Sequence, residues 1–206
     1  MADATTATKK KPFTPIGVFS FPHLFKPRAM QPGAEEKFSV TVIFDEAAQK
    51  TAEYKKMKQA ALDAAEEMWP GKASEMFKAG KIRSPFRDAA EKDQFAGYEA
   101  GKTFINAWSK QPPDVLDGRK NRVASSDVFP GVRGRISYSA FAYDVQGNKG
   151  VSFGLNNAQI VSFNSPRLDS KKSGMDEFDE LDMEDEVDLD DQTSGDDVDL
   201  DDDIPF

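Results

Sequence analysis

The segment Val132–Tyr143 alternates between two kinds of side chain. If it is a strand, successive side chains point to opposite faces. One face then carries Val132, Ile136, Tyr138 and Ala140, and the other carries Arg133, Arg135, Ser137, Ser139, Phe141 and Tyr143. Aromatic rings can stack with nucleobases, and guanidinium groups can pair with phosphates, so the second face predicts a platform for a single-stranded nucleic acid. The alternative is that Phe141 and Tyr143 belong to the core and the arginines pair with acids.

A second aromatic and basic stretch, "FSFPHLFKPR", lies near the N-terminus. Phe19, Phe21, His23 and Phe25 occupy every second position along it, and the basic residues Lys26 and Arg28 follow closely. Such a segment beside a sheet could clamp a strand of nucleic acid. The equally open alternative is that some of these rings fill the core, with Phe19 as the first candidate.

Further candidates for contact with nucleic acid are scattered along the chain. A basic loop, "DGRKNR", could meet phosphates, and "SPFRD" places two arginines around Phe86. A solvated loop is the alternative for both, and burial is the default for a tryptophan. These candidates are Arg83, Arg87, Trp108, Arg119, Lys120, Arg122 and Lys149.

The elements that would position these residues are mostly strands. "KFSVTVIF" alternates as a half-buried strand, and "TFINAWS" is a second strand. Prolines 22, 27 and 32 predict a structured loop around "FPHLFKPR", and Gly147-Asn148 predicts a hairpin turn before "VSFGL" and "AQIVSF". The fold class predicted is mainly β with one inserted α-helix, in a partly open, five-stranded antiparallel barrel of the OB type.

The inserted helix is predicted from a change of period after Asp45. Apolar residues then recur every three or four positions, Asp45 can cap the helix, and Pro70-Gly71 ends it. The apolar stripe comprises Tyr54, Met57, Ala61, Ala64 and Met68. A second short helix is expected around residues 73–79.

Charge divides the chain into a basic body and an acidic tail. Residues 173–206 hold 17 Asp and Glu and no Lys or Arg, whereas residues 1–172 hold 27 Lys and Arg against 19 acids. This asymmetry predicts nucleic-acid contact by the body and an interaction role for the tail. We expect a flexible arm over residues 1–12, a binding domain over 13–170 and a disordered acidic tail over 171–206.

The sequence disfavours enzymes and metal sites. It has no Cys and one His, and it lacks a phosphate-binding P-loop, a dinucleotide fingerprint and a nucleophile elbow. The dense carboxylates lie in the tail, where nothing fixes the geometry that a metal-dependent nuclease needs. No catalytic residue, metal or cofactor is therefore expected. No secretory signal or membrane span is evident, which predicts a cytoplasmic protein.

Several stretches resemble a family of bacteriophage single-stranded-DNA-binding proteins. They are "FPHLFKPR", "SPFRD", "INAW", "GRISYSAFAYD" and "GNKGVSFGLNNAQIV", and together they span most of Phe19–Phe163. The resemblance implies an OB barrel with an inserted helix, and sequence-independent coating of single strands in phage replication or recombination. It places the protein in the cytoplasm of the infected bacterial host. Self-association on DNA is a further expectation.

The end of the chain carries its own resemblance. "DDDIPF" is similar to the terminal peptide of bacterial single-strand-binding proteins, which implies docking of host or phage replication and recombination proteins. The docking residues would be Asp201, Asp202, Asp203, Ile204, Pro205 and Phe206. The alternatives left open are a strand-annealing recombination mediator and a DNA-mimicking protein that acts on a host enzyme.

Overall fold

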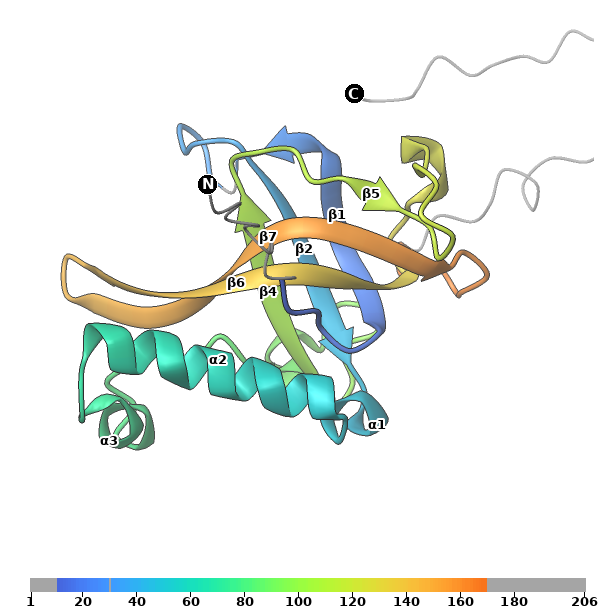
Figure 1. Cartoon of the computed structure of the whole chain (residues 1–206). Helices are drawn as coiled ribbons and strands as arrows, with labels where there is room; N and C mark the ends of the chain where they lie inside the picture. Colours follow the sequence, from blue (N-terminus) through green and yellow to red (C-terminus); the bar gives the residue numbers. More distant parts are fainter. Residues whose placement is uncertain (1–10, 30, 170–206) are drawn as a thin grey trace, which may run out of the picture. The chain divides into compact units, whose positions relative to one another are not determined.

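The computed structural model describes residues 11–29 and 31–169. The acidic tail with its docking tip, and the predicted N-terminal arm up to residue 10, lie outside the described residues. Within the described body, five long strands pair around a ring in the order β1, β2, β4, β7 and β6 (Figure 1). Their bounds are β1 Gly17–Arg28, β2 Lys37–Phe44, β4 Thr103–Ser109, β6 Arg133–Val145 and β7 Asn148–Ser162.

The ring is only narrowly closed at two places. β1 meets β6 through Gly17 opposite Gly134 and one further pair, and β4 meets β7 in parallel through Ala107–Phe153 and one further pair. Two short strands extend the same sheet, β3 (Arg87–Asp88) beside β4 and β5 (Val115–Leu116) beside β7. The predicted barrel of the OB type is confirmed, as a partly closed ring within a seven-stranded sheet.

The segment around "FPHLFKPR" is a strand, which corrects the predicted loop. β1 pairs antiparallel with β2, but its register shifts between Ser20 and His23 and again between His23 and Arg28. Prolines 22 and 27 lie within these irregular stretches. A proline cannot donate a hydrogen bond to a neighbouring strand, and a bulge removes that requirement.

The predicted helix is divided in two near its start. α1 (Glu46–Gln49) is capped by Asp45, whose side chain accepts from the Ala48 N–H at 2.7 Å, and α2 (Ala52–Met68) is capped by Thr51. The buried stripe of α2 is Tyr54, Met57, Ala61 and Ala65. The sequence also placed Ala64 and Met68 in this stripe, but Ala64 is only half-buried and Met68 is exposed.

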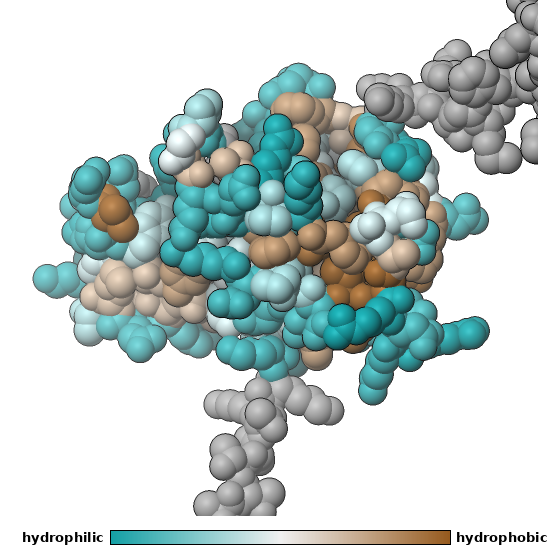
Figure 2. Space-filling model, turned by 90° about the horizontal axis from the view of Figure 1, so that it is seen from above, coloured by the Kyte–Doolittle hydropathy of each residue, from teal (hydrophilic) through white to brown (hydrophobic). Residues whose placement is uncertain are grey.

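The helices cover one side of the ring and complete its core. α2 lies below β6 and β7 in Figure 1, with the predicted short helix α3 (Ala73–Lys78) beside it. Phe19, Phe44, Tyr138 and Phe153 are fully buried between these layers. The face opposite the helices shows hydrophobic patches set among hydrophilic side chains (Figure 2).

β6 and β7 form one long hairpin. The turn has positive φ at Gln146 (49°) and at Gly147 (81°), so the prediction is right for Gly147 and wrong for Asn148, whose place Gln146 takes. β7 is continuous, although the sequence predicted two strands here. A register shift near Ser137 and Tyr138 interrupts the alternation that the sequence pattern predicts.

No helix in the described ranges is long and apolar enough to span a membrane.

Candidate nucleic-acid interface

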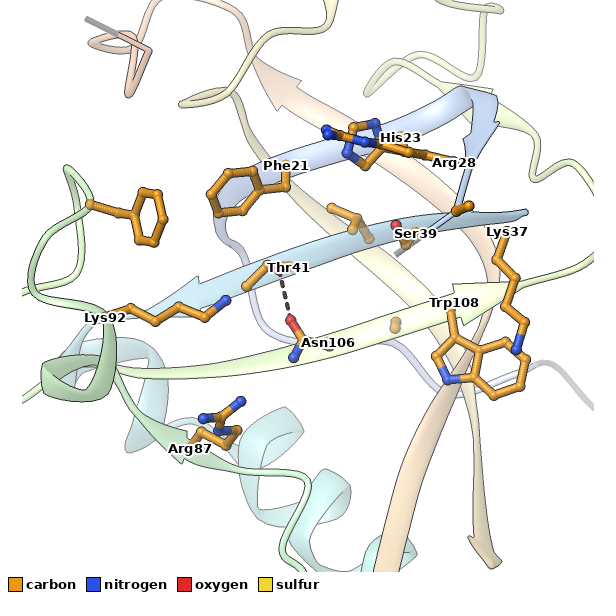
Figure 3. A pocket seen from close by; sticks show the side chains of 14 residues that line it. Phe21, His23, Arg28, Lys37, Ser39, Thr41, Arg87, Lys92, Asn106 and Trp108 are labelled. Atoms are coloured by element: carbon orange, nitrogen blue, oxygen red, sulfur yellow. Dashed lines mark hydrogen bonds between the residues drawn. The ribbon is translucent and has the colours of Figure 1, made fainter. Parts of the chain in front are cut away.

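A groove of about 610 Å³ crosses β1, β2 and β4 (Figure 3). Four of its lining residues are cationic, three are aromatic, and none of these described lining residues is acidic. The lining residues are Phe21, His23, Arg28, Ala29, Lys37, Ser39, Val40, Thr41, Arg87, Lys92, Phe95, Asn106, Ala107 and Trp108.

Phe21 enters the groove because β1 bulges. Ser20 and His23 are three positions apart on β1, while their partners on β2, Thr41 and Ser39, are two positions apart. Phe21 sits in this irregular stretch with φ of 48°, a value that non-glycine residues rarely adopt. A bulge re-aims side chains, and here it leaves the Phe21 ring partly exposed and in edge-to-face contact with Phe95, at 5.3 Å between centroids.

Lys92 brings a positive charge among aromatic rings at this end of the groove. It lies in the short helix η1 (Ala89–Lys92), and its amine is 4.8 Å from the Phe104 ring centroid and 5.6 Å from that of Phe21. The guanidinium of Arg87 lies 5.2 Å from the Phe104 centroid. Burial, and then the nearby Arg87 charge, lower the pKa of Lys92 from its usual 10.5. The two cations therefore lie at one end of the groove.

The middle of the groove is polar and uncharged. The Thr41 hydroxyl donates to the Asn106 side-chain oxygen at 2.7 Å (Figure 3). This hydrogen bond fixes the amide of an exposed side chain, and its nitrogen has no hydrogen-bond partner among residues 11–29 and 31–169. The Asn106 N–H groups are thus available to a ligand oxygen.

Trp108 marks the opposite end of the groove. It is half-buried, with the Lys37 amine 4.0 Å from its ring centroid and Phe141 of β6 in edge-to-face contact at 5.6 Å. Glu35 lies close by, with one carboxylate oxygen 2.7 Å from the Lys110 amine and the other 3.8 Å from that of Lys37. These contacts lower the pKa of Glu35, mainly through the hydrogen bond from Lys110.

Of the fifteen residues predicted to contact DNA, the structure brings four into the groove. They are Phe21, Arg28, Arg87 and Trp108. Phe141 does not line the groove, but its ring contacts that of the lining residue Trp108. Phe25 and Lys26 are exposed on β1 and do not line the groove.

Three predicted residues gather at the β6–β7 hairpin. The Arg83 N–H donates to the Lys149 carbonyl at 2.9 Å, and the Tyr143 ring covers Gly150, where a Cβ would lie 2.3 Å from its hydroxyl oxygen. The Lys149 amine pairs with Asp144 at 3.3 Å.

The remaining predicted residues lie elsewhere on the body. Arg135 donates to Gln159 at 2.9 Å and covers the Phe13 ring, so it is partly engaged in packing, while Arg133 is exposed. Arg119, Lys120 and Arg122 follow β5 in an exposed loop, where Arg122 pairs with Asp114 at 3.1 Å. Their contact with DNA stays a prediction.

Sequence reasoning missed ten of the fourteen residues that line the groove. Lys37, Ser39 and Thr41 are the polar face of an alternating strand, and this pattern could have marked them as candidates. Lys92 and Phe95 come from an irregular segment whose position no local pattern reveals. Nothing in the sequence predicted that His23 lines the groove, apart from its position between aromatic residues.

Within the described ranges, no cluster of three or more His, Asp or Glu side chains could hold a metal ion. The site is instead a cationic and aromatic groove on a five-stranded ring. This combination defines the class of OB-type folds that bind single-stranded nucleic acids.

Comparison with known proteins makes the relationship specific. The family model described as the Enterobacter phage Enc34 ssDNA-binding protein matches residues 16–188. The chain belongs to this family, which confirms the predicted resemblance to bacteriophage single-stranded-DNA-binding proteins. No curated protein sequence matches the chain.

Solved structures agree with the family match. The single-stranded DNA-binding protein from bacteriophage Enc34 in complex with ssDNA superposes with a TM-score of 0.59 at 17% identity, covering 77% of this chain and 86% of that chain. A C-terminal truncation of that protein gives 0.61 at 17% identity, covering 75% and 87%. The single-stranded DNA binding protein gp2.5, encoded by bacteriophage T7, gives 0.55 at 16% identity, covering 87% and 98%. At such identities these likenesses establish the fold.

Proposed function

We propose that the chain binds single-stranded DNA in this groove, without sequence preference, as a binding protein rather than an enzyme. One observation carries the proposal: cations and aromatic rings line the groove and acidic side chains do not. Bases would stack on Phe21 and Trp108, which lie at opposite ends, while phosphates would meet Arg28, Lys37, Arg87 and Lys92. The Enc34 structure with bound ssDNA, which has the same fold, supports binding of single-stranded DNA by this chain.

The groove favours single strands for a physical reason. In a duplex the faces of the bases are already stacked on each other, whereas a single strand can offer them to protein rings. Stacking on an aromatic side chain contributes about 1–3 kcal/mol per base and works for every base. Contacts from Lys and Arg to phosphates add a second term that does not depend on sequence.

A titration with oligo-dT and with duplex DNA tests this function. The full chain should bind oligo-dT more tightly than duplex, and log affinity should fall with log salt concentration by about 0.7 per neutralised phosphate. Equal affinity for both DNAs, or an affinity independent of salt, would contradict the proposal. An assay of complementary-strand pairing on the same samples separates simple coating from an annealing mediator.

The acidic tail completes the proposed function. It lies outside the described residues, and the support comes from the 17 acids and no bases of residues 173–206 against the basic body. The tip Asp201–Phe206 would dock replication and recombination proteins in the cytoplasm of the infected bacterium. The Phe206 ring would fill a partner pocket, basic groups would take the carboxylates, and Pro205 would reduce the ordering cost.

A single substitution at the tip tests docking separately from DNA binding. The full chain should capture replication proteins from an extract of the phage-infected host, and Phe206→Ala should lose them. Because Phe206→Ala leaves the 17 acidic residues of the tail in place, the affinity of this variant for oligo-dT should be unchanged. Equal capture by both chains would contradict the docking role of the tip.

A further inference from the structure

A second, smaller cavity adjoins the groove. Its volume is about 440 Å³, and it is lined by Arg83, Ser84, Phe86, Arg87 and Glu91. Arg87 lines both this cavity and the groove, so a ligand that follows the groove to its Arg87 end arrives at the second cavity.

The wall of this cavity is fixed to the core. The Arg83 N–H donates to the Lys149 carbonyl at 2.9 Å, and the Arg83 carbonyl accepts from the Val151 N–H at 3.1 Å. These two bonds join the segment to β7. The Phe86 ring packs between Tyr54 and Phe153, at centroid distances of 5.3 Å and 5.6 Å. The side chain of Arg83 therefore extends from a backbone with a set position.

The charges in the cavity favour an anion. Arg87 pairs with Glu91, whose carboxylate accepts from the Arg87 Nε at 2.9 Å. Arg83 is exposed and has no ion-pair partner among residues 11–29 and 31–169. Two guanidinium groups thus face one carboxylate, which leaves the positive charge of Arg83 uncompensated.

We infer that this cavity is a phosphate subsite for the DNA strand where it leaves the groove past Arg87, with Arg83 as the main ligand. A guanidinium group presents a planar set of N–H donors that suits the oxygens of a phosphodiester. The edge of the Phe86 ring offers an apolar surface for the sugar next to that phosphate. The inference rests on the proposed function, because it extends the same strand by one contact.

The subsite predicts a dependence on oligonucleotide length. A short strand that fills only the groove should ignore Arg83, whereas a longer strand should reach it. OB folds bind about 4–16 nucleotides, so a series of oligo-dT from about 4 to about 20 nucleotides covers the range.

The experiment compares the full chain with Arg83→Gln over this series. Both should bind the shortest oligo-dT equally, and the variant should bind the longest several-fold more weakly. Its salt slope with long oligo-dT should be smaller by about 0.7, the value for one phosphate. Lys55→Gln on the exposed surface of α2 is the control, because it removes one positive charge and keeps a good helix former.

Each other result has a distinct meaning. Equal binding by Arg83→Gln at every length would overturn the subsite and leave the groove intact. An equal loss at every length, or the same loss in Lys55→Gln, would also overturn it, because the effect would then be general. Failure of the unmodified chain to bind any oligo-dT would overturn the proposed function and the subsite together.

Discussion

The Lys37 amine lies 4.0 Å from the centroid of the Trp108 ring, at one end of the groove. A cation over an indole face is attracted by the ring quadrupole. The pair therefore brings together an aromatic ring that can stack with a base and an amine that can bind the adjoining phosphate, which is the combination that a nucleotide needs. Phe141 packs against the indole in edge-to-face contact, at 5.6 Å between ring centroids.

Replacing Trp108 by alanine should weaken oligo-dT binding by about 1–3 kcal/mol, which is about 5–150-fold in affinity, because one stacking surface is lost. Fluorescence titration of Trp69→Phe, which keeps Trp108 as the one remaining tryptophan of the chain, should show quenching on DNA binding. Unchanged affinity in Trp108→Ala would show that this ring does not stack with DNA.

Glu35 should act against DNA binding. It pairs with Lys110 at 2.7 Å and with Lys37 at 3.8 Å, so an incoming phosphate competes with its carboxylate for the same cations. Glu35→Gln should therefore bind oligo-dT several-fold more tightly at low salt, and the difference should shrink as salt screens the charges. Glu36→Gln is the matched control, since Glu36 is also exposed and forms no ion pair with residues 11–29 or 31–169. Equal gains in both variants would point to net charge alone.

His23 should make stability depend on pH in a defined direction. Burial, and then the charge of Arg28, lower its pKa from the usual 6.5. The unfolded chain then holds more protons than the folded chain just below pH 6.5, so the free energy of unfolding decreases as the pH falls through this window.

Urea unfolding between about pH 5 and pH 7 should show this loss, and His23→Gln should reduce it. His23 is the only histidine of the chain, so a proton NMR titration reports its pKa without ambiguity. A measured pKa at or above 6.5 would contradict the prediction.

Gly134 should be required for closure of the ring. It pairs with Gly17 where β1 meets β6, and a Cβ on Gly134 would lie 2.6 Å from the Gln159 carbonyl oxygen and 2.9 Å from the Phe19 ring. Gly134→Ala should lower the free energy of unfolding by about 1–3 kcal/mol, as overpacking of a core does. Gly118→Ala is the control, because nothing lies within 4 Å of its Cβ and its φ is not positive. Equal denaturation midpoints for the two variants would refute the argument.

Removal of residues 173–206 should strengthen DNA binding at low salt. The deletion takes away 17 acidic residues that are proposed to compete with DNA for the basic body. The gain in oligo-dT affinity should fall as salt rises, because screening weakens both interactions. Unchanged or weaker binding by the shortened chain would count against competition.

The sequence by itself determined the class of fold. Alternation over Lys37–Phe44 has the period of a strand, and the three-and-four spacing of Tyr54, Met57 and Ala61 has the period of an amphipathic helix. Both elements form, but β2 is buried on both faces from Val40 to Phe44, so the predicted half-buried strand is correct only for residues 37–39. Local sequence records the period of an element, whereas burial of its second face depends on what packs there. The family resemblance and the opposite charges of body and tail could also be recognised from the sequence alone.

The tertiary structure decided where the groove lies. The bulge at Phe21 interrupts the simple alternation of side chains along β1. A register shift near Ser137 interrupts the alternation along β6. Lys92 and Phe95 reach the groove from an irregular segment, beside strands that are distant in sequence. A single sequence records which face of an element is buried, but bulges and loop paths depend on packing between elements. The sequence therefore predicted the chemistry of the site, and the fold selected the residues that assemble it.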